Sequence, residues 1–154
     1  MNNNDIFRRL QNILNLDTTK MIEVFSFTNL KVDKDQINNW LKSVDDPGYL
    51  KFGDHHLAPF LNGLIDYKRG KKEDSVPREE KRLTNNIIFT KLKIALNYKS
   101  DDILEIMSLA DYPLRKLELS ALFRRPGNKH FRECKDEVLE GFFKGLEIKY
   151  CSIV

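Results

Sequence analysis

The sequence predicts an all-α protein built from two tandem, pseudo-symmetric helical repeats of about four helices each, packed together. Three observations predict this fold class. Shifting the sequence by 82 positions aligns residues 2–72 with residues 84–154 without a gap and with 15 identities. Apolar residues recur three and four positions apart in both copies, as they do on amphipathic helices. No segment has the pattern of a strand hairpin.

The alignment also predicts the domain organisation. Chance similarity rarely stays in register over 71 residues, so we infer an internal duplication. Residues 2–72 form the first predicted repeat and residues 84–154 the second. Residues 73–83 between them are mostly charged and offer too few apolar side chains to anchor a buried element. We expect this segment to be an exposed linker.

A first helix is predicted at the start of each copy. The apolar stripe consists of Ile6, Leu10, Ile13 and Leu14 in the first copy and of Ile88, Leu92, Ala95 and Leu96 in the second. Paired asparagines, Asn3-Asn4 and Asn85-Asn86, precede the two stripes. A short polar side chain at this place can accept a hydrogen bond from a free helix amide. We therefore interpret the asparagines as N-caps.

Second and third helices follow in each copy. The apolar spacing predicts second helices over residues 18–28 and 101–111. The third helix of the first copy opens at Asp33, with Gln36 in a capping-box position. Its counterpart in the second copy is predicted over residues 114–125, before Pro126-Gly127.

The last helix of each copy contains a glycine at the same position of the repeat. Pro59 is expected in the first turn of this helix in the first copy, and Gly70 near its end. Gly63 and Gly145 each cost about 1 kcal/mol inside a helix relative to alanine. We therefore expect another helix to approach closely at both glycines.

Composition indicates an ordinary globular protein of a reducing compartment. Lysine and arginine total 26 against 23 acidic residues, and the net charge of +3 is weak for a nucleic-acid binder. The sequence has no secretory leader and no apolar run long enough to cross a bilayer, which favours a cytoplasmic location. Cys134 and Cys151 are expected to be free thiols. The end of the chain, Cys151-Ser152-Ile153-Val154, has the outline of a prenylation box, but valine is unusual there, so we interpret it as a plain C-terminus.

Several short motifs are similar to those of a known family. They are Asn3-Asn4-Asp5-Ile6, Phe60-Leu61-Asn62-Gly63-Leu64, Lys68-Arg69-Gly70, Asn85-Asn86 and Phe131-Arg132-Glu133-Cys134. With these motifs the chain resembles, over nearly its whole length, the YehS-like family of uncharacterised bacterial proteins, which is built from a tandem domain of unknown function. The resemblance implies no established activity, cofactor or catalytic residue.

The residues themselves offer little for catalysis or metal binding. His55 and His56 are adjacent and would point about 100° apart on a helix, so they cannot share a metal. His130 and Cys134 have the spacing of two ligands on one helix face, but two ligands do not make a site. No phosphate-binding glycine loop is present in the sequence. We expect no enzyme activity, no metal site and no cofactor.

Nucleic-acid binding is the alternative function that the sequence leaves open. The second and third helices of each copy resemble a degenerate helix-turn-helix. The motif's apolar positions hold Leu30, Val32, Ile37 and Trp40 in the first copy and Tyr112, Leu114, Leu119 and Leu122 in the second. However, Phe27 and Leu109 stand where a small residue is expected, and Lys31 and Pro113 where the turn glycine is expected.

A protein-interaction module, as an adaptor or regulator, is the function that the sequence favours, mainly because the other classes lack residues that they require. Trp40, Tyr49 and Phe52 are interpreted as core residues rather than as binding anchors. The candidate contacts for a protein or nucleic-acid partner gather in the second copy. They are Arg115, Lys116, Arg124, Arg125, Lys129 and Arg132.

Overall fold

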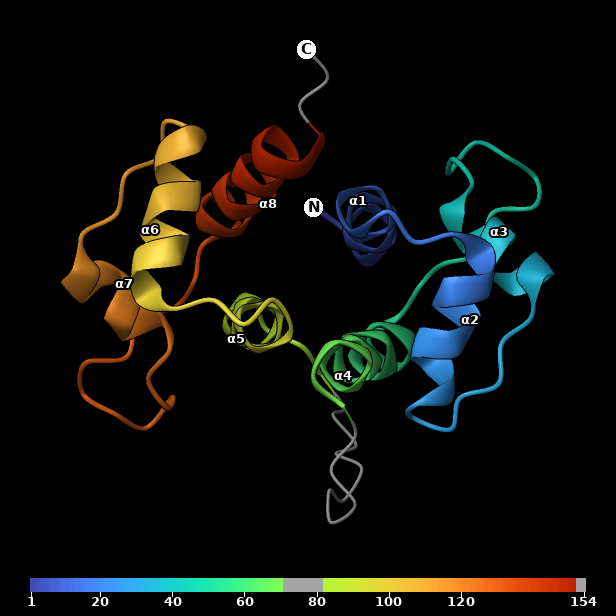
Figure 1. The fold of residues 1–154 in the computed structure, drawn as a ribbon, viewed down its shortest axis with the longest axis horizontal. Helices are drawn as coiled ribbons and strands as arrows, with labels where there is room; N and C mark the ends of the chain where they lie inside the picture. The colour runs from blue at the N-terminus through green and yellow to red at the C-terminus, as the bar shows by residue number, and fades with distance from the viewer. Residues whose placement is uncertain (71–81, 152–154) are drawn as a thin grey trace. The chain divides into compact units, whose positions relative to one another are not determined.

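The computed structural model describes residues 1–70 and 82–151 of the chain. These residues form helices and connecting loops, with no strand among them (Figure 1). The helices are α1 (Asn3–Leu14), α2 (Thr18–Ser26), α3 (Lys34–Leu41), α4 (Asp54–Arg69), α5 (Asn85–Ala95), α6 (Ser100–Leu109), α7 (Lys116–Leu122) and α8 (Asp136–Cys151). The predicted all-α class with four helices per repeat is confirmed.

The chain divides into two compact units, Met1–Leu83 and Thr84–Val154. The packing of the repeats against each other stays a prediction. Most of the predicted linker and the three residues after Cys151 lie outside the described residues. The expectations for the linker and for the prenylation box therefore stay untested.

The first unit is built around a cluster of aromatic side chains. α2 packs along α4, and α1 packs against α3 and α4 (Figure 1). Phe7 of α1 lies at the centre of the cluster, with its ring centroid 4.3 Å from that of Phe52 and 4.8 Å from that of Phe60. Trp40 packs edge-on against Phe52 at 4.9 Å. Both Trp40 and Phe52 are buried, which confirms their interpretation as core residues.

The second unit repeats this plan with its aromatic side chains redistributed. α6 packs along α8, and α5 also packs against α8 (Figure 1). The rings of Phe89 and Phe142 lie 4.6 Å apart. Cys134 is buried at the position equivalent to Phe52, while Phe143 fills the position that Leu61 has in the first unit. The duplication thus preserves the backbone plan more closely than the side chains of the core.

The two helical glycines lie where helices approach each other, as predicted. A Cβ atom added to Gly63 would overlap the carbonyl oxygen of Val24 on α2, and one added to Gly145 would overlap the carbonyl oxygen of Ile106 on α6. Because both obstacles are backbone atoms, a side chain cannot be accommodated by a rotamer change. The close packing of α2 on α4 and of α6 on α8 requires glycine here.

The interpretation of Asn3-Asn4 and Asn85-Asn86 as N-caps is wrong. The capping side chains belong to the preceding residues, Asn2, which accepts from the backbone N–H of Asp5 at 2.8 Å, and Thr84, which accepts from that of Ile87 at 3.2 Å. α1 and α5 therefore begin at the first asparagine of each pair. The second asparagine of each pair, Asn4 or Asn86, is buried in the first turn of the helix.

Asn4 joins α1 to the end of α3 and to the loop that follows. Its Nδ2 donates to the carbonyl oxygens of Trp40 and Leu50, both at 2.9 Å. Its Oδ1 accepts from the Tyr49 hydroxyl and from the Phe52 backbone N–H, both at 3.0 Å. The amide thus satisfies polar groups that would otherwise be buried without partners.

Asn86 makes the equivalent connections in the second unit. Its Nδ2 donates to the carbonyl oxygens of Leu122 and Arg132, both at 2.9 Å, and its Oδ1 accepts from the Cys134 backbone N–H at 2.9 Å. Phe131 replaces Tyr49 and has no hydroxyl group, so this copy lacks the fourth bond.

Two predicted helix positions also need correction. α4 begins at Asp54, so Pro59 lies in its second turn rather than in the first. The helix starts early because Gly53 adopts the extended N-cap conformation and the acidic Asp54 suits the first turn. α7 covers only Lys116–Leu122 of the predicted 114–125. Arg115 is its N-cap, in an extended conformation that keeps the preceding residues outside the helix.

Candidate functional site

The second repeat contains an open hollow of about 770 Å³ on its surface. The hollow is lined by Lys93, Ser100, Ser120, Phe123, Arg124, Arg125, Gly127 and Asn128. These residues come from α5, the start of α6, α7 and the loop after α7. Three of the lining residues are basic and none is acidic, so the hollow favours an anionic ligand.

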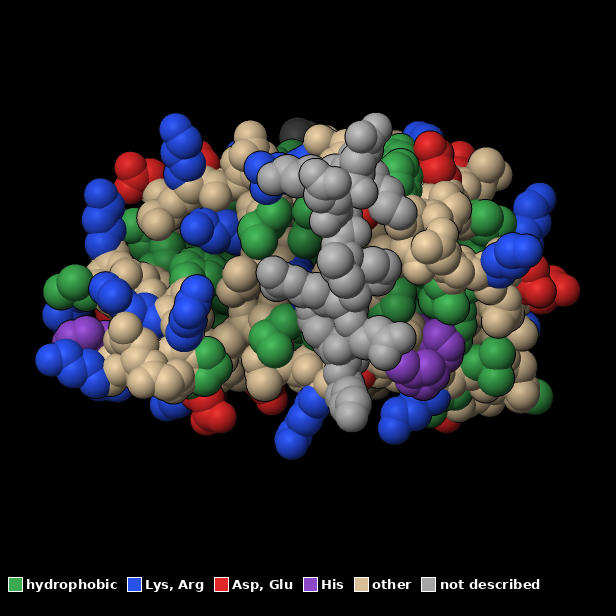
Figure 2. Space-filling model, turned by 90° about the horizontal axis from the view of Figure 1, so that it is seen from below, with side chains coloured by type: hydrophobic (Ala, Val, Ile, Leu, Met, Phe, Trp, Pro, Cys, Tyr) green, Lys and Arg blue, Asp and Glu red, His purple; other side chains and the backbone are tan. Residues whose placement is uncertain are grey.

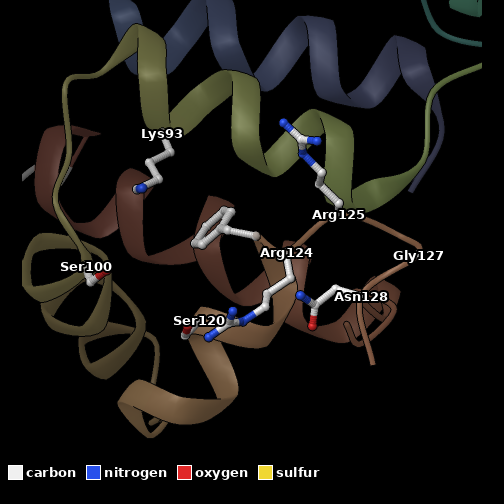
Figure 3. Close-up of a pocket in the computed structure, with 8 residues that line it drawn as sticks. Lys93, Ser100, Ser120, Arg124, Arg125, Gly127 and Asn128 are labelled. Carbon is white, nitrogen blue, oxygen red and sulfur yellow. The ribbon is translucent and has the colours of Figure 1, made fainter. Parts of the chain in front are cut away.

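Phe123 supplies the apolar part of the hollow. Its ring packs edge-on against Phe89 of α5, with the centroids 5.2 Å apart and the planes at 78°. Lys93 Nζ lies 4.9 Å from the centroid of the Phe123 ring, within the range of a cation–π contact. Figure 3 shows Lys93 projecting from α5, Arg124 extending toward Ser120, and Arg125 pointing toward α5. Lys93 thus reaches the hollow from α5, while the two arginines leave the loop after α7 in different directions.

The loop that carries the two arginines has an ordered backbone. The N–H of Asn128 donates to the carbonyl oxygen of Arg125 at 2.9 Å, and the N–H of Phe131 donates to that of Asn128 at 3.0 Å, which makes two consecutive turns. Asn128 Oδ1 accepts from the backbone N–H of His130 at 2.8 Å. With its oxygen in use, the side-chain amide of Asn128 offers its NH₂ group as a donor.

The ends of this loop are tied together by Asn86. Its side chain donates to Leu122, the last residue of α7, and to Arg132, beyond the two turns. The N–H of Arg132 also donates to the carbonyl oxygen of Ala121 at 3.1 Å. The backbone from which Arg124 and Arg125 project is therefore fixed from within the core.

The six predicted contact residues fall into groups that differ in their surroundings. Arg115 Nε lies 3.6 Å from a carboxylate oxygen of Glu118, and Lys116 Nζ lies 3.3 Å from one of Asp101. Neither Arg115 nor Lys116 lines the hollow. These two charges are already balanced by exposed acidic neighbours, so they add little to an anionic site.

The other four predicted contacts lie on the loop. Arg124 and Arg125 line the hollow, and no carboxylate in residues 1–70 and 82–151 forms an ion pair with either. Lys129 and Arg132 are exposed but lie outside the lining, and Arg132 donates to the carbonyl oxygen of Phe131 at 3.0 Å. The structure therefore brings two of the six predicted residues together in one site.

Sequence reasoning missed the rest of the lining. It did not select Lys93 or Ser100, which lie far from the two arginines in the sequence and are brought to them only by the fold. It also did not select Ser120, Phe123 or Asn128, which lie near the arginines but carry no charge. One usable signal was present. Lys93 and Asn128 stand where the first copy has Gln11 and Asp46, so each makes the second copy more positive by one charge.

The first repeat has a different set of side chains at the equivalent positions. They are Gln11, Thr18, Asn38, Leu41, Lys42, Ser43, Asp45 and Asp46. One of them is basic and two are acidic, whereas the second repeat has three basic residues and no acidic one. The two copies share a backbone plan but differ in charge at this place, so the basic hollow belongs to the second repeat alone.

The helix-turn-helix alternative is not favoured by the connections between the relevant helices. Residues 27–33 separate α2 from α3, and residues 110–115 separate α6 from α7. Both connections are longer than the turn of about three to four residues that is typical of the motif. Asn29 and Asp111 adopt a left-handed conformation, with φ of 59° and 56°, at the same position of the two copies.

The structure separates the two residues that had metal-ligand spacing. His130 and Cys134 lie in the loop before α8 rather than on a helix, and Cys134 is buried while His130 is exposed. Burial raises the pKa of the Cys134 thiol to about 12, with a further contribution from Asp136. Within the described ranges, no group of three or more His, Cys, Asp or Glu side chains is placed to hold a metal ion.

Comparison with known proteins decides the family. Residues 3–70 and 85–151 each match "Protein of unknown function (DUF1456)". The chain belongs to the DUF1456 family. A relative of the chain, "Uncharacterized protein YehS" of Escherichia coli (strain K12), is 39% identical over 147 residues, which cover 95% of this chain and 94% of that protein. The expected YehS-like, two-repeat family is confirmed.

DUF1456 is described only as a family of unknown function, so its description assigns no role to the hollow. No solved structure matches the chain. None of the helices in the described ranges has the length and apolar character needed to cross a bilayer.

Proposed function

We propose that the chain is a protein-interaction module whose second repeat binds an acidic segment of a partner protein in the basic hollow. The observation that carries this proposal is that Lys93, Arg124 and Arg125 all line one hollow, and that none of its lining residues carries a carboxylate. Unpaired basic side chains on a fixed backbone attract and orient an acidic ligand. The proposed role requires no catalytic step, cofactor or membrane span.

The surroundings of the hollow favour a protein over a nucleic acid. Leu117 of α7 is 85% exposed and lies three residues before Ser120, on the same face of the helix. Figure 2 shows hydrophobic side chains among the Lys and Arg side chains of the second repeat, on the left of the view. An acidic segment with an apolar residue about one helical turn from its carboxylate would use both features.

Nucleic acid remains the alternative partner, but fewer observations support it. The net charge of +3 is small, and the lysine and the two arginines line a single hollow rather than forming a row along a backbone. The connections that would form helix-turn-helix turns are too long.

Affinity capture with the full chain tests the proposal. The tagged protein and an Arg124→Gln, Arg125→Gln variant would be purified from the native cell, and the captured proteins compared by quantitative mass spectrometry. We expect one acidic protein to be enriched with the unaltered chain and to be lost from the variant. Added salt should weaken its binding.

An Arg115→Gln, Lys116→Gln variant is the matched control. It removes the same number of positive charges from the same repeat, but at residues that do not line the hollow and that pair with Glu118 and Asp101. It should retain the captured protein. Equal capture by both variants would exclude the hollow as the binding site, and loss of capture after nuclease treatment would favour the nucleic-acid alternative.

A further inference from the structure

We infer that the hollow of the second repeat receives a phosphate monoester, supplied by a phosphorylated side chain of the partner segment. This inference rests on the proposed function and specifies the chemistry of its ligand. Phosphorylation would then determine when the partner is bound.

The donors around the hollow match the needs of such a group. Lys93 brings an ammonium group from α5, and Arg124 and Arg125 bring guanidinium groups from the loop after α7. The Ser120 hydroxyl and the free NH₂ of Asn128 add neutral donors. Three cations and at least two neutral donors therefore surround one opening.

The charge of the hollow favours a phosphate over a carboxylate. A phosphate monoester carries a charge of about −1.5 to −2 at pH 7 and three strong acceptor oxygens. A single carboxylate offers one negative charge and two oxygens, which would leave more of the three cations unbalanced. A guanidinium group is also suited to the forked hydrogen bonds that a phosphate accepts, and two of the lining residues are arginines.

The same comparison disfavours the phosphodiesters of nucleic acids. Each diester carries a single charge, and binding them in series needs basic groups spread along the strand. Here Lys93, Arg124 and Arg125 line one hollow and form no ion pair with a carboxylate of the described residues, while Arg115 and Lys116 at the start of α7 lie within 4 Å of Glu118 and Asp101. One doubly charged group fits this distribution better than a row of singly charged ones.

The first repeat provides an internal reference for the inference. Asp45 and Asp46 stand at the positions of Gly127 and Asn128, and Ser43 stands at that of Arg125. The acidic pair would repel a phosphate from the equivalent place. A phosphate monoester should therefore bind to the second repeat and not to the first.

Small probes allow a direct test on the full chain by two-dimensional NMR. The probes are N-acetyl-phosphoserine amide, N-acetyl-glutamate amide as the carboxylate, and dimethyl phosphate as the diester. We expect the phosphoserine probe to shift the signals of Ser120, Arg124, Arg125 and Asn128 with an affinity at least about tenfold above those of the other two. The signals of Asp45 and Asp46 should stay in place.

The pH dependence provides a second readout. The second pKa of a phosphate monoester is about 6, so binding of the phosphoserine probe should weaken as the pH falls from 7.5 to 5.5. Arg124→Gln with Arg125→Gln should abolish the shifts without changing the rest of the spectrum, which checks folding at the same time.

The results separate this inference from the proposed function. Equal affinity for the glutamate and phosphoserine probes, or partner capture that survives phosphatase treatment, would overturn the phosphate inference while leaving an acidic partner in place. Tighter binding of dimethyl phosphate would overturn it in favour of nucleic acid. Phosphoserine binding at the hollow without any captured protein would support the inference on the ligand and count against the proposed partner.

Discussion

Asn86 holds the carbonyl oxygen of Arg132 at 2.9 Å and so closes the loop from which the basic hollow is built. The same amide group reaches Leu122 at the other end of the loop. Asn4 makes the corresponding bonds to Leu50 and Trp40 in the first repeat. One buried asparagine per repeat thus fixes the long connection before the last helix, and in the second repeat that connection carries two candidate binding residues.

Replacing Asn86 with alanine should destabilise the protein by about 2–3 kcal/mol, because it leaves two carbonyl oxygens and the Cys134 N–H without their partner. Urea unfolding followed by circular dichroism measures this loss. Asn38→Ala, on the exposed side of α3, is the control and should change stability by less than about 0.5 kcal/mol. If the two variants were equally stable, the asparagine would not have the structural role assigned to it.

Replacement by alanine should lower the free energy of unfolding far more at Gly145 than at Gly127. A Cβ at Gly145 meets the backbone of Ile106, whereas one at Gly127 meets no atom within 4 Å. We expect Gly145→Ala to lower the free energy of unfolding by at least about 2 kcal/mol and Gly127→Ala to change it by less than about 1 kcal/mol. A tolerated Gly145→Ala would contradict the close approach of α6 and α8.

His56 should make the first repeat less stable at acidic pH. Burial lowers its pKa, neighbouring His55 lowers it further, and its Nδ1 has no hydrogen-bond partner in the described structure. The pKa of His56 in the folded protein lies below the ordinary value of 6.5. The contribution of the neutral imidazole to the free energy of unfolding is therefore present above pH 6.5 and is lost as the pH falls through the folded pKa. The imidazole packs on Trp40 and Phe52, which offer no compensating charge.

Urea titrations at pH 7.5 and pH 5.0 would measure this effect. The His56→Val variant carries the residue that the second repeat has at the equivalent position, Val138. We expect it to lose less stability between the two pH values than the unaltered chain. The same loss in both proteins would assign the acid sensitivity to other groups.

The Cys134 thiol should be unreactive in the folded protein. Its pKa is raised to about 12, mainly by burial, so almost no thiolate is present at pH 8. In a Cys151→Ser background, labelling with a thiol reagent should proceed only as fast as the second repeat opens, and it should become fast in urea. Fast labelling under native conditions would show that the thiol is accessible without unfolding.

Much of the fold could be predicted from the sequence because the duplication presents the same helix pattern in two aligned segments. The apolar stripes of α1 and α5 predict a first helix in each copy, and the glycines of α4 and α8 predict a close approach of helices in each copy. The asparagine pairs were misinterpreted for a physical reason. A cap and a buried bridging amide favour the same residue type near a helix start, and only the fold places Asn4 beside Trp40 and Leu50.

The candidate site could be predicted only in part. Arg124 and Arg125 are adjacent in a charged segment, so the sequence indicates them directly. Lys93 and Ser120 belong to helices whose faces become neighbours only after folding. The pairing of Arg115 with Glu118 also depends on side-chain geometry that residue order does not determine.

The hollow of the second repeat should bind an acidic segment that the first repeat cannot bind. A variant with Arg125→Ser, Gly127→Asp and Asn128→Asp carries the residues of the first repeat at these positions. It should fold, because Asp46 already accepts from the Gly48 N–H in the equivalent turn.

The deciding measurement is the amount of partner protein that this variant captures relative to the unaltered chain at the same salt concentration. We expect the partner to be lost while the circular dichroism spectrum is unchanged. Undiminished capture by the folded variant would contradict it.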